Sequence, residues 1–436
     1  MRASIIYGAI LGLSTFTKLC AAASSCAPSL PPRPTVAPFP YNHGKPHAVS
    51  PRRTKTCYVH AFGNGQDDSQ IIFSAAKACN NGGTVALLDP KYIIGQALDL
   101  TFLQSVDFII KGEISFTEDI NYWLQASFKY TYQGACLFWQ FGGKDVNIYG
   151  GGMINGNGQV WWDRMVTNIT LQRPILVGVV GLQGGTFNDL SLSNPPNWFH
   201  FVANSSDLIF DNMTMTVLSN NSNPSKNSDG WDLYRSDAIV IQNSYISNTD
   251  DCVSFKPNST NVVVQNLRCT GSHGISVGSL GQYLGETDIA ENLYIYNTSM
   301  SNAGDGARIK VYPGAVPGSN STSSGGGVGI VRNVTYNGMH DTGVDYAIEL
   351  TQCYGQSNVT LCNMYPSKML IEDIVFNDFT GTSKKYDPTV GTLVCSNQTA
   401  CQNIVATNIN ITNPSGKVAQ WTCKNVDKST LAINCV

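Results

Sequence analysis

The sequence predicts an all-β solenoid in which short parallel strands stack in successive coils. Two observations favour this class over helical and mixed folds. From Val85 onward helical periodicity is missing, and short apolar segments recur with Asn or Asp at their ends. In addition, 13% of the residues are charged and 41 are Gly, a composition that is typical neither of helical bundles nor of disordered chains. Strand-length segments that repeat every roughly 20 to 40 residues indicate stacked coils.

The repeated segments are about four residues long, and in the second half of the chain they begin 23 to 41 residues apart. They begin at Asp145, Asp189, Asp207, Ala238, Asn261, Asn292, Asn333, Asp373 and Asn403. We expect alternate apolar side chains of each segment to fill the interior. The repeated Asn residues are expected to stack from coil to coil and to hydrogen-bond through the bend.

A β-sandwich is the competing all-β fold. It is disfavoured because the repeated segments are too far apart to be joined by two-residue Asn-Gly hairpin turns. The longer intervals are expected to hold insertions, such as the Gly- and Ser-rich stretch from Pro313 to Gly327. Loops of this kind would flank a groove.

The first residues have the order of a secretory signal. Arg2 is followed by an apolar run from Ile5 to Phe16 and by the small residues Ala21 to Ala23, so residues 1–23 are interpreted as a signal peptide. The apolar run is about 12 residues, whereas a membrane span needs about 20. The sequence therefore predicts secretion and no membrane partner.

Residues 24–55 are interpreted as a Pro-rich, flexible N-terminal extension. Dibasic processing at Arg52-Arg53 is a weaker interpretation of the same stretch. Residues 56–436 are predicted to form the solenoid, which contains the catalytic site.

A short capping helix is predicted at the start of the solenoid. Asp67-Asp68-Ser69 precedes an apolar face at helical spacing, and Gly82 follows its end. Capping of this helix is a better interpretation of the two aspartates than catalysis, because the region offers them no partner.

Twelve cysteines follow the signal segment, which contains Cys20. An even number in an oxidising compartment indicates disulfides. Short loops favour Cys252–Cys269, Cys353–Cys362, Cys395–Cys401, Cys423–Cys435 and Cys57–Cys79, with Cys26 and Cys136 left over. A zinc site is disfavoured because there is no Cys-x-x-Cys and no His cluster beside the cysteines.

The charge of the chain gives no reason to expect nucleic acid as a partner. The formal net charge is −3 and the sequence pI is about 6.1, so any anion must be bound locally. Many acceptor sites for N-linked glycans support an extracellular surface. They are Asn168, Asn204, Asn212, Asn220, Asn258, Asn297, Asn320, Asn333, Asn358, Asn397 and Asn410.

The candidate catalytic residues lie between Asn227 and Lys310. If one coil takes roughly 22 residues, Asp229, Asp250, Asp251 and His273 stack on adjacent coils and share one face. Carboxylates at short range raise one another's pKa, so one can act as a general acid while the others stay ionised. Hydrolysis of a glycosidic bond needs this division of labour. His273 would either hold the protonation state of the acid or cap a turn.

Arg308 and Lys310 are separated by Ile309, so on a strand both cations point to the same side. Three uses stay open from the residues alone. The cations can be salt-bridge partners of the aspartates, they can bind carboxylates of a substrate, or they can form a solvated face.

Four motifs in this order resemble the polygalacturonases, glycoside hydrolase family 28. They are Asn227-Ser228-Asp229, Asp250-Asp251-Cys252, Ser272-His273-Gly274 and Arg308-Ile309-Lys310. The likeness extends over most of the chain from about Cys57 to Cys435, and longer stretches resemble the secreted fungal exopolygalacturonases. Ser228 and Ser272 depart from the Thr and Gly that many members have, which are small changes.

The resemblance implies a right-handed parallel β-helix that hydrolyses α-1,4-linked galacturonan with inversion and without metal or other cofactor. Asp250 would be the general acid, Asp229 and Asp251 would position and deprotonate water, and His273 would assist the acid. Arg308, Lys310 and Tyr346 would bind the substrate.

From this we expect a secreted, monomeric, N-glycosylated exopolygalacturonase that releases galacturonate from the non-reducing end of pectic chains. An endo-acting enzyme and a hydrolase of xylogalacturonan or rhamnogalacturonan are the nearest alternatives. A Ca²⁺-dependent pectate lyase would share the fold, and a non-catalytic carbohydrate-binding β-helix is the alternative from a different class.

Overall fold

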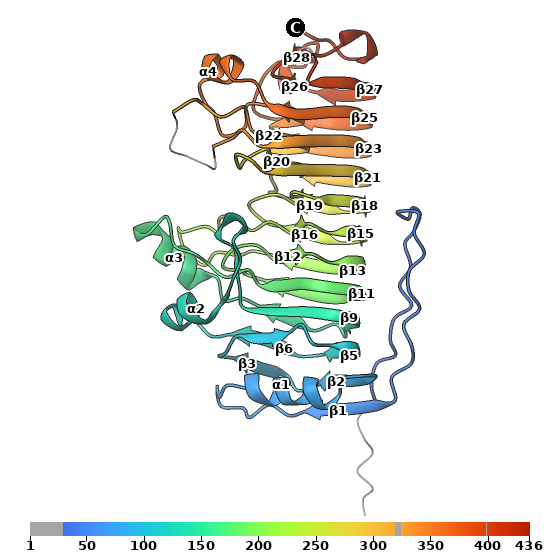
Figure 1. The fold of residues 1–436 in the computed structure, drawn as a ribbon, viewed down its shortest axis with the longest axis vertical. Helices are drawn as coiled ribbons and strands as arrows, with labels where there is room; N and C mark the ends of the chain where they lie inside the picture. The colour runs from blue at the N-terminus through green and yellow to red at the C-terminus, as the bar shows by residue number, and fades with distance from the viewer. Residues whose placement is uncertain (1–28, 319–323, 398) are drawn as a thin grey trace, which may run out of the picture. The chain divides into compact units, whose positions relative to one another are not determined.

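The computed structural model describes residues 29–318, 324–397 and 399–436. The predicted signal peptide, residues 1–23, lies outside them. Pro32–Val436 form one compact unit, a right-handed parallel β-helix in which strands of successive coils pair in parallel (Figure 1). This pairing confirms the predicted solenoid and excludes the sandwich, which is built from antiparallel sheets. Across the described residues, a search for a helix long and apolar enough to cross a membrane finds none.

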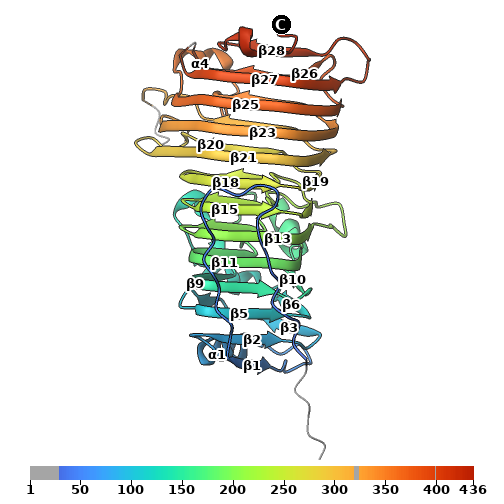
Figure 2. The ribbon, with the colours of Figure 1, turned by 90° about the vertical axis from the view of Figure 1, so that its right-hand side faces the viewer.

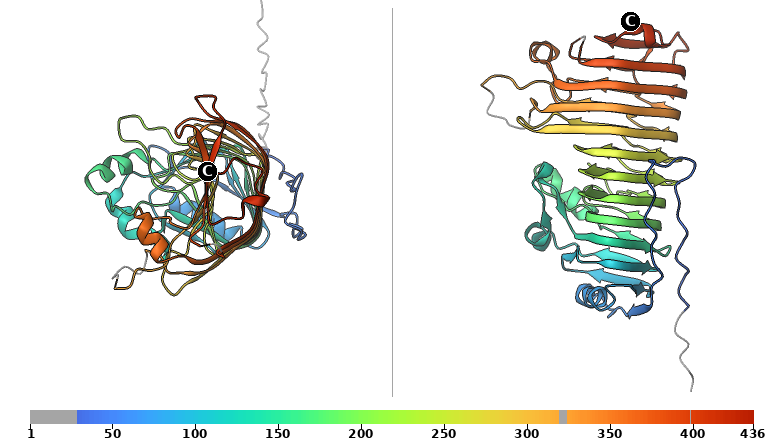
Figure 3. Two further views of the ribbon diagram at one scale, coloured as in Figure 1. Left: turned by 90° about the horizontal axis from the view of Figure 1, so that it is seen from above. Right: turned by 45° about the vertical axis from the view of Figure 1, so that its right-hand side comes forward.

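The strands lie on three faces of the β-helix, as the view along the stack shows (Figure 3). The long face contains β1 (Lys55–Val59), β2 (Gly83–Leu87), β5 (Gln104–Ile110), β9 (Trp139–Tyr149), β11 (Val177–Ser193), β13 (Ser206–Thr216), β15 (Asp237–Gln242), β18 (Ser259–Gln265), β21 (Thr287–Ser301), β23 (Val328–Val344), β25 (Lys368–Ser383) and β27 (Cys401–Thr412). The ends of the longest of these strands bend into a second face, whose separate strands are β3 (Lys91–Ile94), β6 (Glu113–Phe116), β10 (Met153–Asn155), β16 (Tyr245–Ser247) and β19 (Arg268–Thr270).

The third face contains the residues predicted to be catalytic, and we call it the site face. Its strands are β4 (Leu98–Leu100), β12 (His200–Ala203), β14 (Trp231–Tyr234), β17 (Val253–Phe255), β20 (Ile275–Leu280), β22 (Asp305–Val311), β24 (Tyr346–Thr351), β26 (Thr389–Val394) and β28 (Gln420–Lys424). From β12 to β28 each pairs with the next in parallel.

Helices, 3-10 turns and a short antiparallel strand pair lie in the connections between the strands of the coils or follow the last strand. They are α1 (Ser69–Ala78), α2 (Ile120–Ala126), α3 (Gln159–Thr167), α4 (Val359–Met364), the 3-10 turns η1 (Tyr132–Gly134) and η2 (Lys428–Thr430), and the antiparallel pair β7 (Phe128–Lys129) and β8 (Cys136–Leu137). The predicted capping helix is α1, which covers the first coil with Ile72 and Ala76 buried.

Of the two aspartates before α1, Asp67 caps the helix start as predicted, because it accepts from the backbone N–H of Ser69, whereas Asp68 acts differently. Asp68 occupies the N-cap position, but its side chain makes no capping hydrogen bond. It accepts instead from the backbone N–H of Phe62 and Ile93, because the neighbouring loop and strand leave these donors unpaired. Asp67 accepts from Ser69 and Gly95. The aspartates therefore fix the helix start to the first coils.

Stacked asparagines confirm the predicted ladder. Asn292 donates to Asn261 at 3.0 Å, and Asn333 donates to Asn292 at 2.8 Å. These residues have φ between 52° and 59°, the left-handed region that Asn tolerates better than most residues. The repeated Asn is therefore a bend residue, and its side-chain amide donates a hydrogen bond to the equivalent Asn of the preceding coil.

All five disulfides favoured by the sequence are present. Cys136 is buried and has no disulfide partner in the described part of the chain. Cys26, its remaining counterpart, lies outside the described residues, so that pairing stays a prediction.

Residues 32–54, which we call the N-terminal arm, were expected to be flexible, and the structure differs. The arm runs up the outer side of the long face and back (Figure 2). The backbone N–H groups of Phe39 and Tyr41 donate to Gln242 and Gln265 on β15 and β18. Val36 packs on an outward apolar patch formed by Ile209, Val240 and Val263. The arm thus covers apolar surface that the coils leave exposed.

Ion pairs hold both ends of the arm. Arg33 and Arg53 both reach the buried Asp107, at 2.8 and 3.0 Å, and Arg53 also pairs with Asp145 at 2.9 Å. On the returning half of the arm, His47 contacts Asp207. The dibasic pair therefore has a structural use, because the guanidinium of Arg53 is buried between two carboxylates.

Candidate active site

One row of outward side chains crosses the site face from coil to coil. Asp232, Ser254, Ser276, Arg308 and Glu349 are successive register partners on β14, β17, β20, β22 and β24. In each strand, the residues immediately before and after the member of this row point to the core, as strand alternation requires. The row forms the floor on which the candidate residues lie.

The predicted catalytic residues occupy the turn that leads into these strands. The backbone N–H of Gly230 donates to the carbonyl of Asp251, and the N–H of His273 donates to that of Asp250. Asp229, the Asp250-Asp251 pair and His273 therefore lie on three adjacent coils. The expectation that their spacing places them on one face is met by the geometry.

Asp250 and His273 form a pair. The Nδ1 atom of His273 lies 3.1 Å from Oδ1 of Asp250, and their side chains are 49% and 19% exposed. Asn227 donates to the other oxygen of Asp250 at 3.3 Å, and Arg173 holds Asn227 in place. The hydrogen bond with Asp250 raises the pKa of His273 in spite of burial, which acts in the opposite direction. Asp250 is the most accessible of the three aspartates.

Asp251 is buried and paired with Lys310. The Nζ atom of Lys310 donates to Oδ2 of Asp251 at 2.5 Å, and the hydroxyl of Ser276 donates to Oδ1 at 2.7 Å. Burial favours the neutral acid, but the charges of Lys310, Lys256 and Arg308 outweigh it and hold the pKa of Asp251 well below its ordinary value. Of the uses that the sequence left open for Lys310, the structure shows the salt bridge.

Asp229 has the opposite electrostatic environment. Burial and the charges of Asp232 and Asp250 raise the pKa of Asp229 well above its ordinary value. Lys256 lies 3.8 Å from Asp229 and 3.0 Å from Asp232. Burial also raises the pKa of Asp232 to about 7, although Lys256 opposes it. The surroundings therefore favour the neutral form of Asp229 and the ionised form of Asp251.

Asp232 and Lys256 were not among the site residues predicted from the sequence. Strand alternation was the available signal, because Trp231 and Leu233 point inward and leave Asp232 on the outer face. Lys256 follows β17 and reaches back over the floor, where the ring of Trp198 lies 5.2 Å from its Nζ.

Along the stack of coils, His273 lies between Asp229 and Arg308. Its Nε is 2.7 Å from Glu349 and 3.2 Å from Asp305. Burial raises the pKa of Asp305 to about 7, against the effect of Arg308. A cavity of about 230 Å³ opens here, lined by His273, Gly304, Asp305, Arg308, Asp345, Tyr346, Glu349, Lys385 and Tyr386. The structure thus brings Arg308, Tyr346 and His273 to one cavity.

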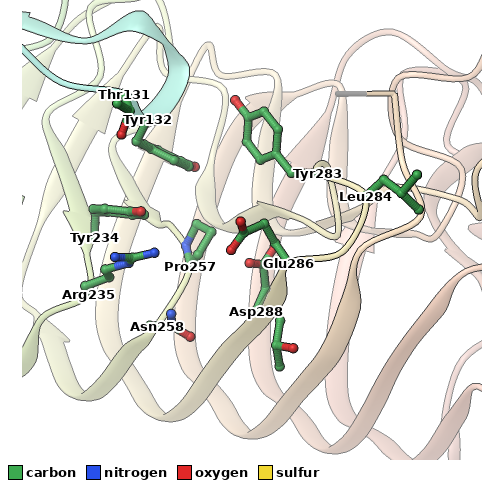
Figure 4. A pocket seen from close by; sticks show the side chains of 11 residues that line it. Thr131, Tyr132, Tyr234, Arg235, Pro257, Asn258, Tyr283, Leu284, Glu286 and Asp288 are labelled. Atoms are coloured by element: carbon green, nitrogen blue, oxygen red, sulfur yellow. The ribbon is translucent and has the colours of Figure 1, made fainter. Parts of the chain in front are cut away.

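On the other side, beyond Lys256, two loops meet. Gln133 donates to Gln282 at 3.0 Å, and Tyr132 stacks on Tyr234 with ring centroids 4.2 Å apart. Tyr132 also contacts Tyr283, and the two rings face the same space in Figure 4. A cavity of about 330 Å³ lies on this side, with Glu286 and Asp288 in its lining. We call these contacts between residues 132–133 and 282–283 the loop bridge.

Within the part of the chain that the structure describes, two groups have the residue types to hold a metal ion. One ligand atom each of Asp250, Asp251 and His273 lies within 4.8 Å of the others, and so do those of His43, His47 and Asp207. In the first group, Lys310 and Ser276 already take both oxygens of Asp251. These donors favour acid–base chemistry over metal binding in the site.

A parallel β-helix with grouped aspartates, a histidine and two cations on one face has the architecture of a polysaccharide-degrading enzyme. The family profile named Glycosyl hydrolases family 28 matches residues 79–433, and the chain belongs to this family.

Similar proteins cover nearly the whole chain. The "Probable exopolygalacturonase X" of Aspergillus fumigatus is 56% identical over 394 residues, 90% of this chain and 91% of that protein. The "Exopolygalacturonase" of Cochliobolus carbonum is 54% identical over 403 residues, 91% of this chain and 90% of that protein. Among solved structures, the endo-xylogalacturonan hydrolase of Aspergillus tubingensis is 32% identical with a TM-score of 0.79, covering 87% of this chain and 98% of that one.

Proposed function

We propose that this chain is an exopolygalacturonase, which hydrolyses α-1,4-galacturonosyl linkages of pectic chains from the non-reducing end and releases galacturonate. The observation that carries the proposal is the arrangement of the three aspartates: the accessible Asp250–His273 pair lies beside the buried Asp229 and the Lys310-paired Asp251. The surroundings favour the neutral form of Asp229 and the ionised form of Asp251. Similarity to proteins named exopolygalacturonase supports the substrate.

Asp250 is the general acid in this proposal. It is the accessible aspartate, and the His273 hydrogen bond orients it toward the open side of the floor. The glycosidic oxygen takes its proton from Asp250 as the bond to the sugar breaks. The leaving part of the substrate then lies on the side of His273, because the acid must face the leaving oxygen.

Asp229 and Asp251 act together on the attacking water. The surroundings of the pair favour an ionised Asp251 and a neutral Asp229, so Asp251 accepts the water proton while Asp229 holds the water by a hydrogen bond. Lys310 keeps Asp251 ionised before the reaction. Attack from the face opposite the acid inverts the anomeric centre. We therefore expect the first galacturonate released to be the β-anomer, which proton NMR during the first turnovers distinguishes from the α-anomer of a retaining enzyme.

Exo action is supported by the loop bridge. It lies on the Lys256 side of the floor, opposite to His273 and the leaving group, where Tyr132 is within electrostatic range of Lys256 and Asp232. A chain that continued in that direction would meet Tyr132 and Gln133. We infer that the bridge limits the substrate to a single terminal unit on that side, in contrast to the open groove that an endo-acting enzyme requires.

The test is digestion of galacturonate trimer by the wild type and by Asp250→Asn. Monomer and dimer from the wild type and none from the variant support the assignment. Products with the absorbance of unsaturated uronates would show that the enzyme cleaves by elimination and not by hydrolysis. Release of xylosylated oligomers from xylogalacturonan, without monomer from the trimer, would favour the activity named for the Aspergillus tubingensis structure.

The chain is further proposed to be secreted as a monomeric glycoprotein without residues 1–23. Exposed acceptor sites such as Asn204 and Asn220 support glycosylation. The mass and N-terminal sequence of protein collected from a fungal culture medium, before and after enzymatic deglycosylation, check both points.

A further inference from the structure

We propose that Lys385 and Tyr386 form a binding subsite for a second galacturonate unit on the leaving side of the site. This inference rests on the proposed function. It assigns a ligand to the end of the 230 Å³ cavity that lies beyond Arg308 and Tyr346. In a site that releases a terminal unit, the first leaving unit occupies Arg308 and Tyr346. The next unit then needs its own partners.

The position of the cavity on the coils supports the order of the units. His273, Asp305, Asp345 and Lys385 lie in the same turn of successive coils, before or at the start of β20, β22, β24 and β26. Backbone bonds connect these turns, since Asp345 N–H donates to the carbonyl of Gly304 at 2.8 Å. Strands pair about 4.8 Å apart, so β26 lies about 10 Å beyond β22. Lys385 is therefore displaced from Arg308 along the stack, in the direction of the leaving chain.

An aromatic platform is present at this position. The rings of Tyr346 and Tyr386 stack with centroids 4.4 Å apart and an interplanar angle of 18°. Both tyrosines line the cavity and are partly exposed. A pyranose ring presents an apolar face that packs on such a surface, and the tyrosine hydroxyl groups supply hydrogen bonds at its edge. The platform extends from the expected site of the first leaving unit toward the second.

Positive charge is in local excess around Asp345, whereas Glu349 and Asp305 already pair with Arg308. Asp345 is shared by two lysines, at 3.1 Å from Lys385 and 3.7 Å from Lys384. Two ammonium groups on one carboxylate leave a positive charge without a counter-ion among these three side chains. The side chain of Lys385 is 54% exposed, and its Nζ lies 4.8 Å from the centroid of Tyr386. An incoming carboxylate can therefore reach the ammonium above the platform.

The two lysines provide a matched control. Lys385 lines the cavity and Lys384 does not, although both contact Asp345. Removing either one takes the same charge from the protein. Only Lys385→Ala should weaken a ligand that lies in the cavity.

The experiment compares galacturonate dimer and trimer as substrates. The dimer ends at the first leaving unit and the trimer fills the second, so Lys385→Ala should raise KM for the trimer by about three- to tenfold and leave dimer kinetics unchanged. Lys384→Ala should match the wild type with both substrates, and Lys385→Arg should restore the trimer KM. Tyr386→Leu should give the same length-dependent loss.

A trimer methyl-esterified only at its reducing-end unit tests the carboxylate contact. With this esterified trimer, the wild type should have the same KM that Lys385→Ala has with the unesterified trimer. Equal trimer KM values for wild type and Lys385→Ala would overturn the subsite while leaving the proposed function intact. A wild type that cleaves neither substrate would instead overturn the proposed function.

Discussion

The ammonium of Lys310 and the carboxylate of Asp251 lie 2.5 Å apart, although the residues are 59 positions apart in the sequence. Both side chains are buried, at 6% and 1% exposure. A buried charge without its partner is strongly destabilising, and a pair removed as a unit costs much less. This pair connects the stability of the site face with the ionisation of the candidate base.

Lys310→Met should therefore lower the free energy of unfolding by about 3–5 kcal/mol, because Asp251 loses its counter-charge. The double variant Lys310→Met/Asp251→Asn should recover a substantial part of that loss, since no unpaired charge is left. Urea denaturation of the two single variants and the double variant measures the coupling. Additive losses would show that Lys310 does not stabilise Asp251.

The variant Asp250→Asn tests whether Asp250 is the general acid. We expect kcat to fall by about 10²- to 10⁴-fold, which is the usual contribution of a positioned general acid. Thermal unfolding followed by circular dichroism is the control, and Tm should change little because Asp250 is the accessible aspartate of the three. Retained activity in a folded Asp250→Asn protein would remove Asp250 from the role of acid.

The pH profile should report the Asp250–His273 pair. The pKa of His273 is raised above its ordinary value, so the stabilisation by its charged form is fully present below about pH 6.5 and is lost as pH rises through the folded pKa. Activity should fall on that alkaline limb, together with the stability that the pair contributes. His273→Gln should abolish the limb in kcat/KM, and an unchanged limb would assign it to another group.

The sequence predicted the coils because their determinants are local. Asn261 and Asn292 sit where each strand begins, and the positive φ and the stacked amides follow from that position. The aspartates and His273 were predicted for the same reason, as they lie at equivalent points of adjacent coils. Cysteines in short loops likewise predicted five disulfides.

Features that depend on distant contacts were not predicted. Arg53 is buried because Asp107 and Asp145 lie on coils far along the chain, which no local pattern shows. The loop bridge between Gln133 and Gln282 joins two insertions, so its existence required the fold. Lys256 was missed because its reach to Asp232 depends on neighbouring coils.

The N-terminal arm offers a stability prediction with a matched control. Arg53→Ala should cost about 3 kcal/mol, since it leaves Asp145 without its arginine and Asp107 with Arg33 alone, whereas the exposed Arg52→Ala should be nearly neutral. Urea denaturation compares the two variants. Equal losses would show that the arm is held by something other than the buried guanidinium.

The most direct test of the account uses a galacturonate oligomer tagged at its reducing end and follows products from the first minutes. Exo action from the non-reducing end predicts untagged monomer as the sole small product, with the tagged chain shortening by one unit at a time. Tagged short fragments and a spread of untagged oligomers at the first time point would contradict it.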